Sequence, residues 1–402
     1  MRNKIVGISL AVLGLTACGG SDSGGTVSDA CNELNSESFS CDTMLNDLVA
    51  EGVQPLATEF KTELLELDTA VDAYCDASGT KELAQTAWSN AMVPLQKMQA
   101  MNFGPNADAD NGLLSFYDWQ FANAVNIDAA IANNAENASG LSGINNRKDL
   151  IAVEYVLFTD DGTYTYELAT GDENKTVVDT WVEGESTAKL QADRCDYAQL
   201  ITEDLKTRAV TLESAWNSYD LASVANSKQA AANEVTQGFF YADKQIKDAK
   251  VGGALPIKDD NVFDATKLES QFAKTSKEHL INNLHGLKHI FTAGNGVGID
   301  DYLVEVGEES LSNEMINNID NAIANLEYID TSSTSLFEII DSASPEQEEL
   351  CKNAVSYDGV SNIEALCAFV NKTIKGLTDN LKEDFTMATE FTIPASASGD
   401  ND

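Results

Sequence analysis

One carboxylate lies where a charge is costly. Residues 150–158 read LIAVEYVLF, with a single charged residue at Glu154. On a helix this segment is apolar on every face, which is typical of a helix buried in the protein interior. An ionised carboxylate in that setting is strongly unfavourable unless it is paired, protonated or bound to a metal ion. Glu154 is therefore the first candidate for a functional group.

Two explanations for a buried Glu154 follow, and both stay open. In the first, the carboxylate makes a structural tie to an arginine or to backbone groups and holds two bundles together. The candidate arginines are Arg147, on the same helical stripe, and Arg194. In the second, Glu154 belongs to a ligand-binding or proton-handling site, with iron or zinc as the candidate metal ion.

All three histidines fall in one predicted helix. His285 and His289 are four residues apart and can chelate one divalent ion. Glu278 lies on the same stripe and joins the pair only if the helix bends, whereas His279 lies off it. An apolar stripe runs nearly opposite, so we expect the pair to face solvent or a partner. The alternative to a metal site is a merely polar helix face.

The common catalytic signatures are absent from this sequence. It contains no HExxH, no GxSxG elbow and no P-loop, so no complete hydrolase or nucleotide-binding constellation is visible. Residues 108–112 suggest a calcium loop, but counting from Asn106 places Asn111 and Tyr117 where an EF-hand needs Gly and Glu. A helix-capping turn is the better interpretation. We therefore expect binding rather than catalysis.

Most of the chain after Cys41 has the 3.6-residue period of packed helices, with only six prolines in 402 residues. This pattern predicts an all-α fold. Turn signals at 104–112, 140–145 and 252–256 separate the helical stretches. We expect helices over residues 54–77, 80–102, 111–134, 146–158, 186–218, 222–250, 264–292, 299–328 and 360–388.

The N-terminus has the layout of an export signal. Arg2 and Lys4 precede an apolar run that ends Leu-Thr-Ala-Cys at Cys18, which resembles the cleavage box of bacterial lipoproteins. This predicts a signal peptide over residues 1–17, acylation of Cys18 and membrane attachment through that lipid anchor. The residue after Cys18 is Gly, which favours an outer-membrane lipoprotein facing the periplasm, with surface exposure left open.

A Gly/Ser-rich stretch follows Cys18, so residues 18–42 are predicted to be a flexible tether. At the other end, residues 394–402 are small and polar and predict a loose tail. Six cysteines remain after Cys18, an even number in a compartment that permits disulfides. Fifteen pairings are possible, and we expect Cys31 with Cys41, Cys75 with Cys195, and Cys351 with Cys367.

The charge balance excludes one class of function. The chain has 25 Lys and Arg against 65 Asp and Glu, a formal net charge of −40. Such a surface repels polyanions, so we expect no nucleic-acid partner. It would concentrate cations instead, although adaptation to a saline habitat explains the acidity equally well.

The residues around Glu154 resemble the signature helix of the imelysin family, bacterial envelope proteins once classed as peptidases. The family pattern is Gly-x-His-x-x-Glu followed by Tyr and an apolar run. Here Glu154 and Tyr155 match it, whereas Asp149 and Ile151 stand at the Gly and His positions. Weaker likenesses follow in order along the chain, at residues 88–105, 116–119, 126–128, 194–197, 286–303 and 391–402.

The resemblance implies two helical-bundle domains related by a pseudo-repeat, placed at residues 43–220 and 221–393. It also implies an iron-uptake-linked role, with binding of a metal or metal complex through Glu154 and nearby carboxylates or histidines, and an envelope iron-transport component as partner. The alternatives are a metallopeptidase-like enzyme, for which Ile151 leaves the motif incomplete, and a non-catalytic interaction scaffold with a purely structural Glu154.

Overall fold

The computed structural model describes residues 31, 36, 39–121, 123–137, 147–159, 173–224, 227–257 and 262–389. The predicted signal peptide, Cys18, most of the tether and the tail at 394–402 lie outside these residues. Every element in the described part of the chain is helical, which confirms the all-α prediction. No helix among these residues is both long enough and apolar enough to cross a membrane.

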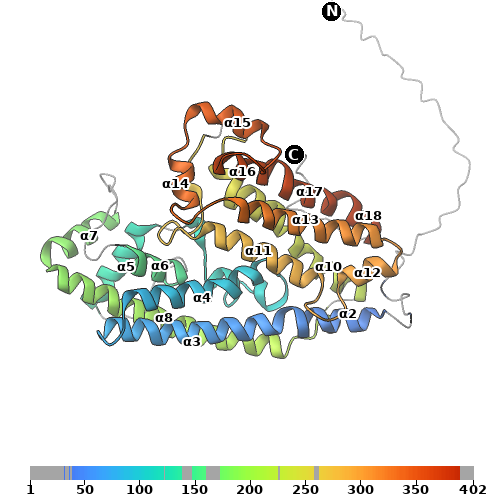
Figure 1. Ribbon diagram of the computed structural model, residues 1–402. Coiled ribbons are helices and arrows are strands. Elements are labelled where there is room, and N and C mark those ends of the chain that lie inside the picture. The colour runs from blue at the N-terminus through green and yellow to red at the C-terminus, as the bar shows by residue number, and fades with distance from the viewer. Residues whose placement is uncertain are drawn as a thin grey trace, which may run out of the picture.

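The first half of the chain contributes the longest helices, and Figure 1 shows α3, α4 and α8 lying side by side. The short helix α6 packs against both α4 and α8. The helices of this half are α2 (Cys41–Asp47), α3 (Gln54–Cys75), α4 (Lys81–Gln99), α5 (Ala124–Asn137), α6 (Leu150–Phe158), α7 (Glu173–Gly184) and α8 (Thr187–Asn217).

The second half lies against the first through α11, which contacts α4 on one side and α13 on the other. A π-helical segment at Ala242–Val251 also contacts α11. The remaining helices are α9 (Leu221–Val224), α10 (Lys228–Phe239), α11 (Ser276–Phe291), α12 (Ile299–Glu305), α13 (Glu309–Tyr328), α14 (Leu336–Asp341), α15 (Glu348–Asn353), α16 (Asn362–Ala368), α17 (Ile374–Asn380) and α18 (Thr386–Thr389).

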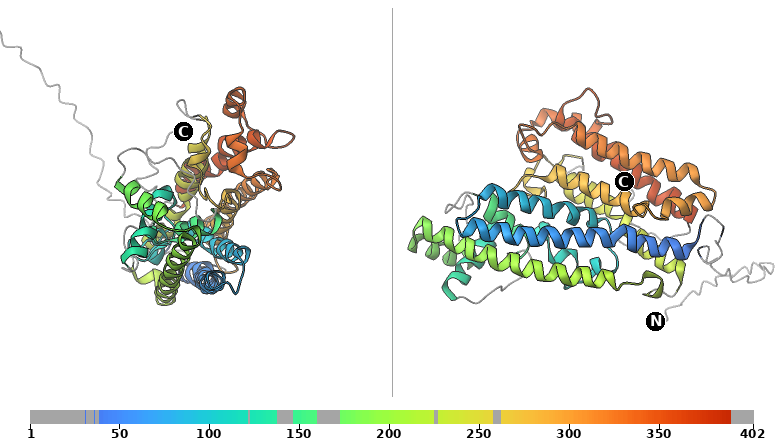
Figure 2. Two further views of the ribbon diagram at one scale, coloured as in Figure 1. Left: turned by 90° about the vertical axis from the view of Figure 1, so that its left-hand side faces the viewer. Right: turned by 60° about the horizontal axis from the view of Figure 1, so that its bottom comes forward.

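A glycine sets the distance between the two halves. A Cβ atom at Gly286 of α11 would lie 2.0 Å from the carbonyl oxygen of Lys97 and 2.5 Å from its Cα on α4. Only a residue without a side chain allows the two backbones to approach this closely. One buried apolar cluster extends through both halves. Figure 2 shows the helices of the two halves from two further directions. The division into domains at residue 220 stays a prediction.

Three disulfides are present, with the pairings predicted from the sequence. Cys75 at the end of α3 is joined to Cys195 on α8, across 120 residues of chain. The other two bonds close short loops, Cys31–Cys41 and Cys351–Cys367. The long-range bond fastens two of the three main helices of the first half to each other.

Several predicted helices are wrong over part of their length, and two of these departures lie beside α6. Residues 111–121, expected to be helical, form two 3-10 turns, at Leu113–Ser115 and Trp119–Phe121. Residues 264–275 form a short 3-10 turn and a loop, and α11 starts only at Ser276. Both segments approach α6, and their polar backbone groups bond there rather than within a helix.

Candidate functional site

Helix α6 is buried almost completely, as its composition predicts. Asp149 is its N-cap, and its Oδ1 accepts hydrogen bonds from the amides of Ile151 (3.0 Å) and Ala152 (3.4 Å). The other oxygen accepts from the amide of Asp118 at 3.0 Å, and the amide of Leu150 donates to the carbonyl of Phe116 at 2.9 Å. The backbone amide of Asp118 and the carbonyl of Phe116 thereby form hydrogen bonds with the start of α6 and not within a helix of their own, which explains why residues 116–118 are not helical.

The Glu154 side chain is 1% exposed and is enclosed by hydrogen-bond donors. Its Oε1 accepts from the hydroxyl of Ser270 (3.0 Å) and from the amides of Phe272 (3.1 Å) and Ala273 (2.9 Å). Its Oε2 accepts from the hydroxyl of Tyr117 at 3.4 Å. Burial raises the pKa of Glu154, and the donors from Ala273, Ser270 and Phe272 together with His279 oppose that rise.

The loop that holds Glu154 is locally strained. Ser270 and Lys274 have positive φ angles of 54° and 59°, in the left-handed region that residues with a side chain seldom adopt. These two turns aim the amides of Phe272 and Ala273 at one carboxylate oxygen. The hydrogen bonds to Glu154 offset the cost of this backbone conformation, so the loop and the carboxylate stabilise each other.

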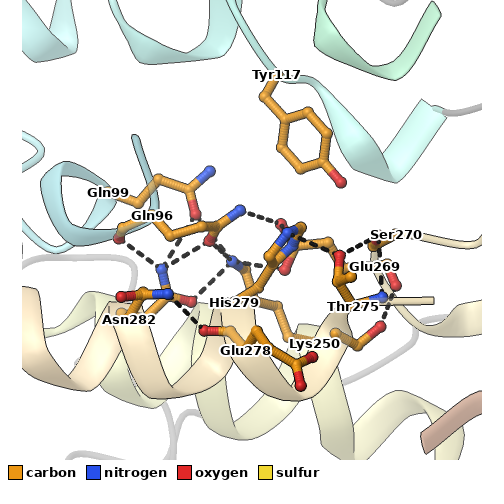
Figure 3. A network of polar contacts seen from close by, with 12 residues as sticks. Gln96, Gln99, Tyr117, Lys250, Glu269, Ser270, Thr275, Glu278, His279 and Asn282 are labelled. Atoms are coloured by element: carbon orange, nitrogen blue, oxygen red, sulfur yellow. Dashed lines mark hydrogen bonds and ion pairs between the residues drawn. The ribbon is translucent and has the colours of Figure 1, made fainter. Parts of the chain in front are cut away.

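A chain of polar contacts continues from Ser270 into the interior (Figure 3). The hydroxyls of Ser270 and Thr275 lie 2.9 Å apart, and the Thr275 hydroxyl lies 3.1 Å from Nε2 of His279. On the other side of the ring, His279 Nδ1 is 3.5 Å from a carboxylate oxygen of Glu269. Two hydroxyls and one imidazole thus lie between Glu154 and Glu269, with the last step, from His279 to Glu269, an ion-pair contact.

The last member of this series of polar contacts is Lys250, which is 1% exposed. Lys250 Nζ lies 2.8 Å from Glu269 Oε2 and donates to the side-chain oxygens of Gln96, Gln99 and Asn283, each at 2.8 Å. This satisfies the donors of the buried ammonium. Burial lowers the pKa of Lys250. Burial alone would raise the pKa of Glu269, but attraction to Lys250 and His279 lowers it to about 2.

This network reaches a cleft of about 340 Å³, called here the tyrosine cleft. Tyr117 lines the cleft and donates to Glu154, and Figure 3 shows its ring above the network with the hydroxyl turned toward it. Tyr241 donates to Gln99 at 2.7 Å, and both also line the cleft. The full lining is Gln99, Asn102, Leu113, Leu114, Tyr117, Asp118, Trp119, Gln120, Tyr241 and Gln245.

The arginines proposed as partners for Glu154 are placed elsewhere. Arg194 is buried and pairs with Asp128 at 3.1 Å, and its Nη2 also donates to the hydroxyl of Tyr155 at 3.2 Å. Arg147 contributes its carbonyl oxygen, which accepts from Tyr197 at 2.8 Å. Of the two structural ties considered, the one to backbone amides is therefore the one that the structure forms at Glu154.

The residues proposed as metal ligands do not gather in one place. His285 and His289 share a face of α11, with His285 exposed and His289 half-buried, and burial lowers the pKa of both. Glu278 is exposed at the start of α11, far along the helix from that pair. Across the described ranges, no three His, Cys, Asp or Glu side chains form a group that could hold a metal ion. Glu154 lies apart because its oxygens face the 270–273 loop.

Sequence reasoning missed most members of the network. Lys250 and Glu269 are ordinary polar residues in the sequence, and only the fold makes them buried partners 2.8 Å apart. His279 was set aside because it lies off the stripe of the other histidines, although it is the buried one. Tyr117 lies in the aromatic stretch 116–119, and that clustering of aromatic residues was the available signal.

The sequence and the fold are both similar to those of known proteins. The family model described as Imelysin matches residues 53–365. An imelysin-like protein from Psychrobacter arcticum has a similar fold, with a TM-score of 0.63 at 13% identity over 90% of this chain and 100% of that one. A protein from Parabacteroides distasonis described as an iron-regulated protein A precursor gives 0.57 at 16% identity, over 85% and 95%. Comparison with curated proteins finds no match.

Proposed function

Because the imelysin model covers most of its length, this chain belongs to the imelysin family, and on that premise we propose that it is a lipid-anchored envelope protein that binds a metal complex in an iron-linked role. The observation that carries the proposal is the tyrosine cleft beside the buried network. Two tyrosine side chains in its wall are held in place by hydrogen bonds, Tyr117 by Glu154 and Tyr241 by Gln99. Rigid polar groups on an aromatic wall are typical of a small-molecule site.

The cargo that suits this cleft is a complex rather than a bare ion. Both oxygens of Glu154 already accept hydrogen bonds. Asp118 is the one carboxylate that lines the cleft, and a single carboxylate is a poor ligand set for iron or zinc. A metal that arrives with its own organic chelator needs no protein ligand. The rings of Tyr117 and Trp119 can then contact the chelator, and the amide of Gln245 can hydrogen-bond to it.

The proposed setting is the periplasmic side of the outer membrane. It is supported by the lipoprotein-like box ending at Cys18 and by the net charge of −40, which raises the local concentration of cations. The solved structure described as an iron-regulated protein A precursor supports an iron link. The partner we propose is an envelope component of iron transport that takes up the bound complex.

Fluorescence titration with ferrioxamine B, a ferric hydroxamate complex with a net positive charge, tests the proposal, because Trp119 lines the cleft. We expect saturable quenching in the wild type, weaker binding after Tyr117→Phe and loss of the signal after Trp119→Phe. Trp181→Phe is the matched control, since Trp181 donates to Asp193 at 2.9 Å and does not line the cleft. Quenching that persists in Trp119→Phe, or none in the wild type, would overturn the proposal.

Two further arms separate the alternatives. Metal analysis of the purified protein is repeated after the double change His285→Ala and His289→Ala, and loss of metal in that variant alone would place the ion on α11 instead. Casein digestion, with and without a chelator, addresses the peptidase alternative. Chelator-sensitive cleavage by the purified protein would replace binding by catalysis as the function.

A further inference from the structure

A second, larger cleft of about 580 Å³ lies where the turn after α4 meets the end of α8 and α10. We call it the Glu234 cleft, and it shares only Asn102 with the tyrosine cleft. Phe103 and Tyr219 give it an aromatic side, and Glu234 with Asp108 gives it an acidic one. Its volume is in the range of small-molecule sites.

The rings on the aromatic side of the cleft pack edge-to-face through Trp216 behind them. Trp216 packs edge-on against Phe103 with ring centres 5.4 Å apart and against Tyr219 at 5.2 Å. Gly104 has a φ angle of 51°, and a Cβ atom there would come within 2.8 Å of the Tyr219 ring. The turn is therefore pressed against Tyr219, which leaves the wall little freedom to move.

Glu234 is held in place by two neutral donors. Its Oε1 accepts from the Tyr219 hydroxyl at 3.1 Å and from the Gly104 amide at 3.2 Å. Burial, followed by the charge of Glu234, raises the pKa of Tyr219, so the phenol stays a donor. These contacts orient the Glu234 carboxylate. Because both donors are neutral, its negative charge can still attract a cation in the cleft.

The second carboxylate is kept ionised by its own turn. Asp108 accepts from the amides of Asn111 (2.8 Å) and Asp110 (3.0 Å), and these bonds lower its pKa. None of the residues that line the cleft is Lys, Arg or His. Two negative charges beside an aromatic wall, with no basic residue in the lining, favour a cation that also has hydrocarbon parts.

We propose that the Glu234 cleft binds a small organic ammonium ion. The ammonium group lies between Glu234 and Asp108, and the alkyl chain packs on Tyr219. A neutral molecule of the same shape would make only the contact with the Tyr219 ring. A bare metal ion would be attracted only by the two carboxylates. This site is separate from the proposed metal-complex cleft and does not depend on it.

Isothermal titration with putrescine at physiological ionic strength tests this proposal, with 1,4-butanediol as the neutral probe of similar shape. Glu234→Gln keeps an oxygen for Tyr219 and Gly104 but removes the charge. We expect it to weaken putrescine binding at least tenfold, and Asp108→Asn to weaken it as well. Glu203→Gln is the matched control, because it removes one charge from an exposed position on α8. Butanediol should not bind.

Several results would overturn the proposal. Equal weakening by Glu203→Gln and Glu234→Gln would mean that putrescine follows the overall charge of −40 and has no specific site. Butanediol binding as tightly as putrescine would contradict an ammonium site, and so would a wild type that binds neither. Thermal unfolding of each variant shows whether the fold is retained, and a folded Asp108→Asn variant keeps the test valid should Glu234→Gln unfold.

Discussion

Replacing Glu154 by leucine measures what the carboxylate contributes to the fold. The side chain volume is nearly kept, but every acceptor is removed. The partly buried amides of Phe272 and Ala273 then lose the oxygen that they now contact at 3.1 and 2.9 Å. The hydroxyls of Ser270 and Tyr117 can rotate, and Ser270 keeps Thr275 as a neighbour at 2.9 Å.

The magnitude follows from those two amides. Each buried donor without an acceptor costs about 1–3 kcal/mol, so the pair costs about 2–6 kcal/mol. Removing a carboxylate that is itself unfavourable to bury returns part of this cost. We therefore expect Glu154→Leu to lower the free energy of unfolding by about 3 kcal/mol. Glu154→Gln keeps one oxygen for the same donors and should cost only about 1 kcal/mol, the difference between charged and neutral hydrogen bonds.

Equilibrium denaturation in guanidinium chloride, followed by far-UV circular dichroism, distinguishes these variants. A leucine variant as stable as the wild type would refute the reasoning, because the 270–273 loop would then not depend on Glu154. If leucine and glutamine were equally damaging, the negative charge rather than the acceptor would matter. Ferrioxamine B binding by a stable glutamine variant shows whether the carboxylate also serves the tyrosine cleft.

Three other predictions concern stability and use the same measurement. Gly286→Ala should cost about 3 kcal/mol, because the new methyl group would meet the backbone of Lys97 at 2.0 Å; an unchanged midpoint would show that α4 and α11 can separate freely. Removing the Cys75–Cys195 bond by a double alanine change should cost about 5 kcal/mol, since the bond closes a loop of 120 residues; a loss comparable to that from opening Cys351–Cys367 would contradict this. Burial raises the pKa of Asp149 from 3.8 to about 7, so its contribution to the free energy of unfolding is complete below about pH 4 and is lost as pH rises through about 7. Over that range the free energy of unfolding of the wild type should fall by about 4 kcal/mol relative to that of Asp149→Asn. Parallel pH curves for the two proteins would contradict the raised pKa.

The long helices could be predicted because their own periodicity determines them. The expected ranges 54–77, 80–102 and 186–218 correspond to α3, α4 and α8 within three residues at each end. These helices bury one face against each other, and the 3.6-residue pattern records that burial directly. The break at Gly307 between α12 and α13 was not predicted, although its φ angle of 90° is one that glycine adopts most readily.

Two of the segments at which the helix prediction failed lie beside α6. Residues 264–275 have enough helix formers to continue α11 toward the N-terminus, but their amides bond to Glu154 instead. Residues 116–118 bond to Asp149 and Leu150 in the same way. A buried carboxylate distant in sequence competes with the local helix for the same backbone donors, and no local pattern records that competition.

Distance along the sequence also limits how much of the Glu154 site could be predicted. The sequence could show that Glu154 needs compensation, because the apolar run around it is local. It could not show the compensating groups, since Ser270, Phe272 and Ala273 are more than a hundred residues away and two of them contribute only their backbone amides. A backbone donor has no sequence signature, so the sequence left an arginine and the backbone open as partners of Glu154, and the structure forms the tie with backbone amides of a strained loop.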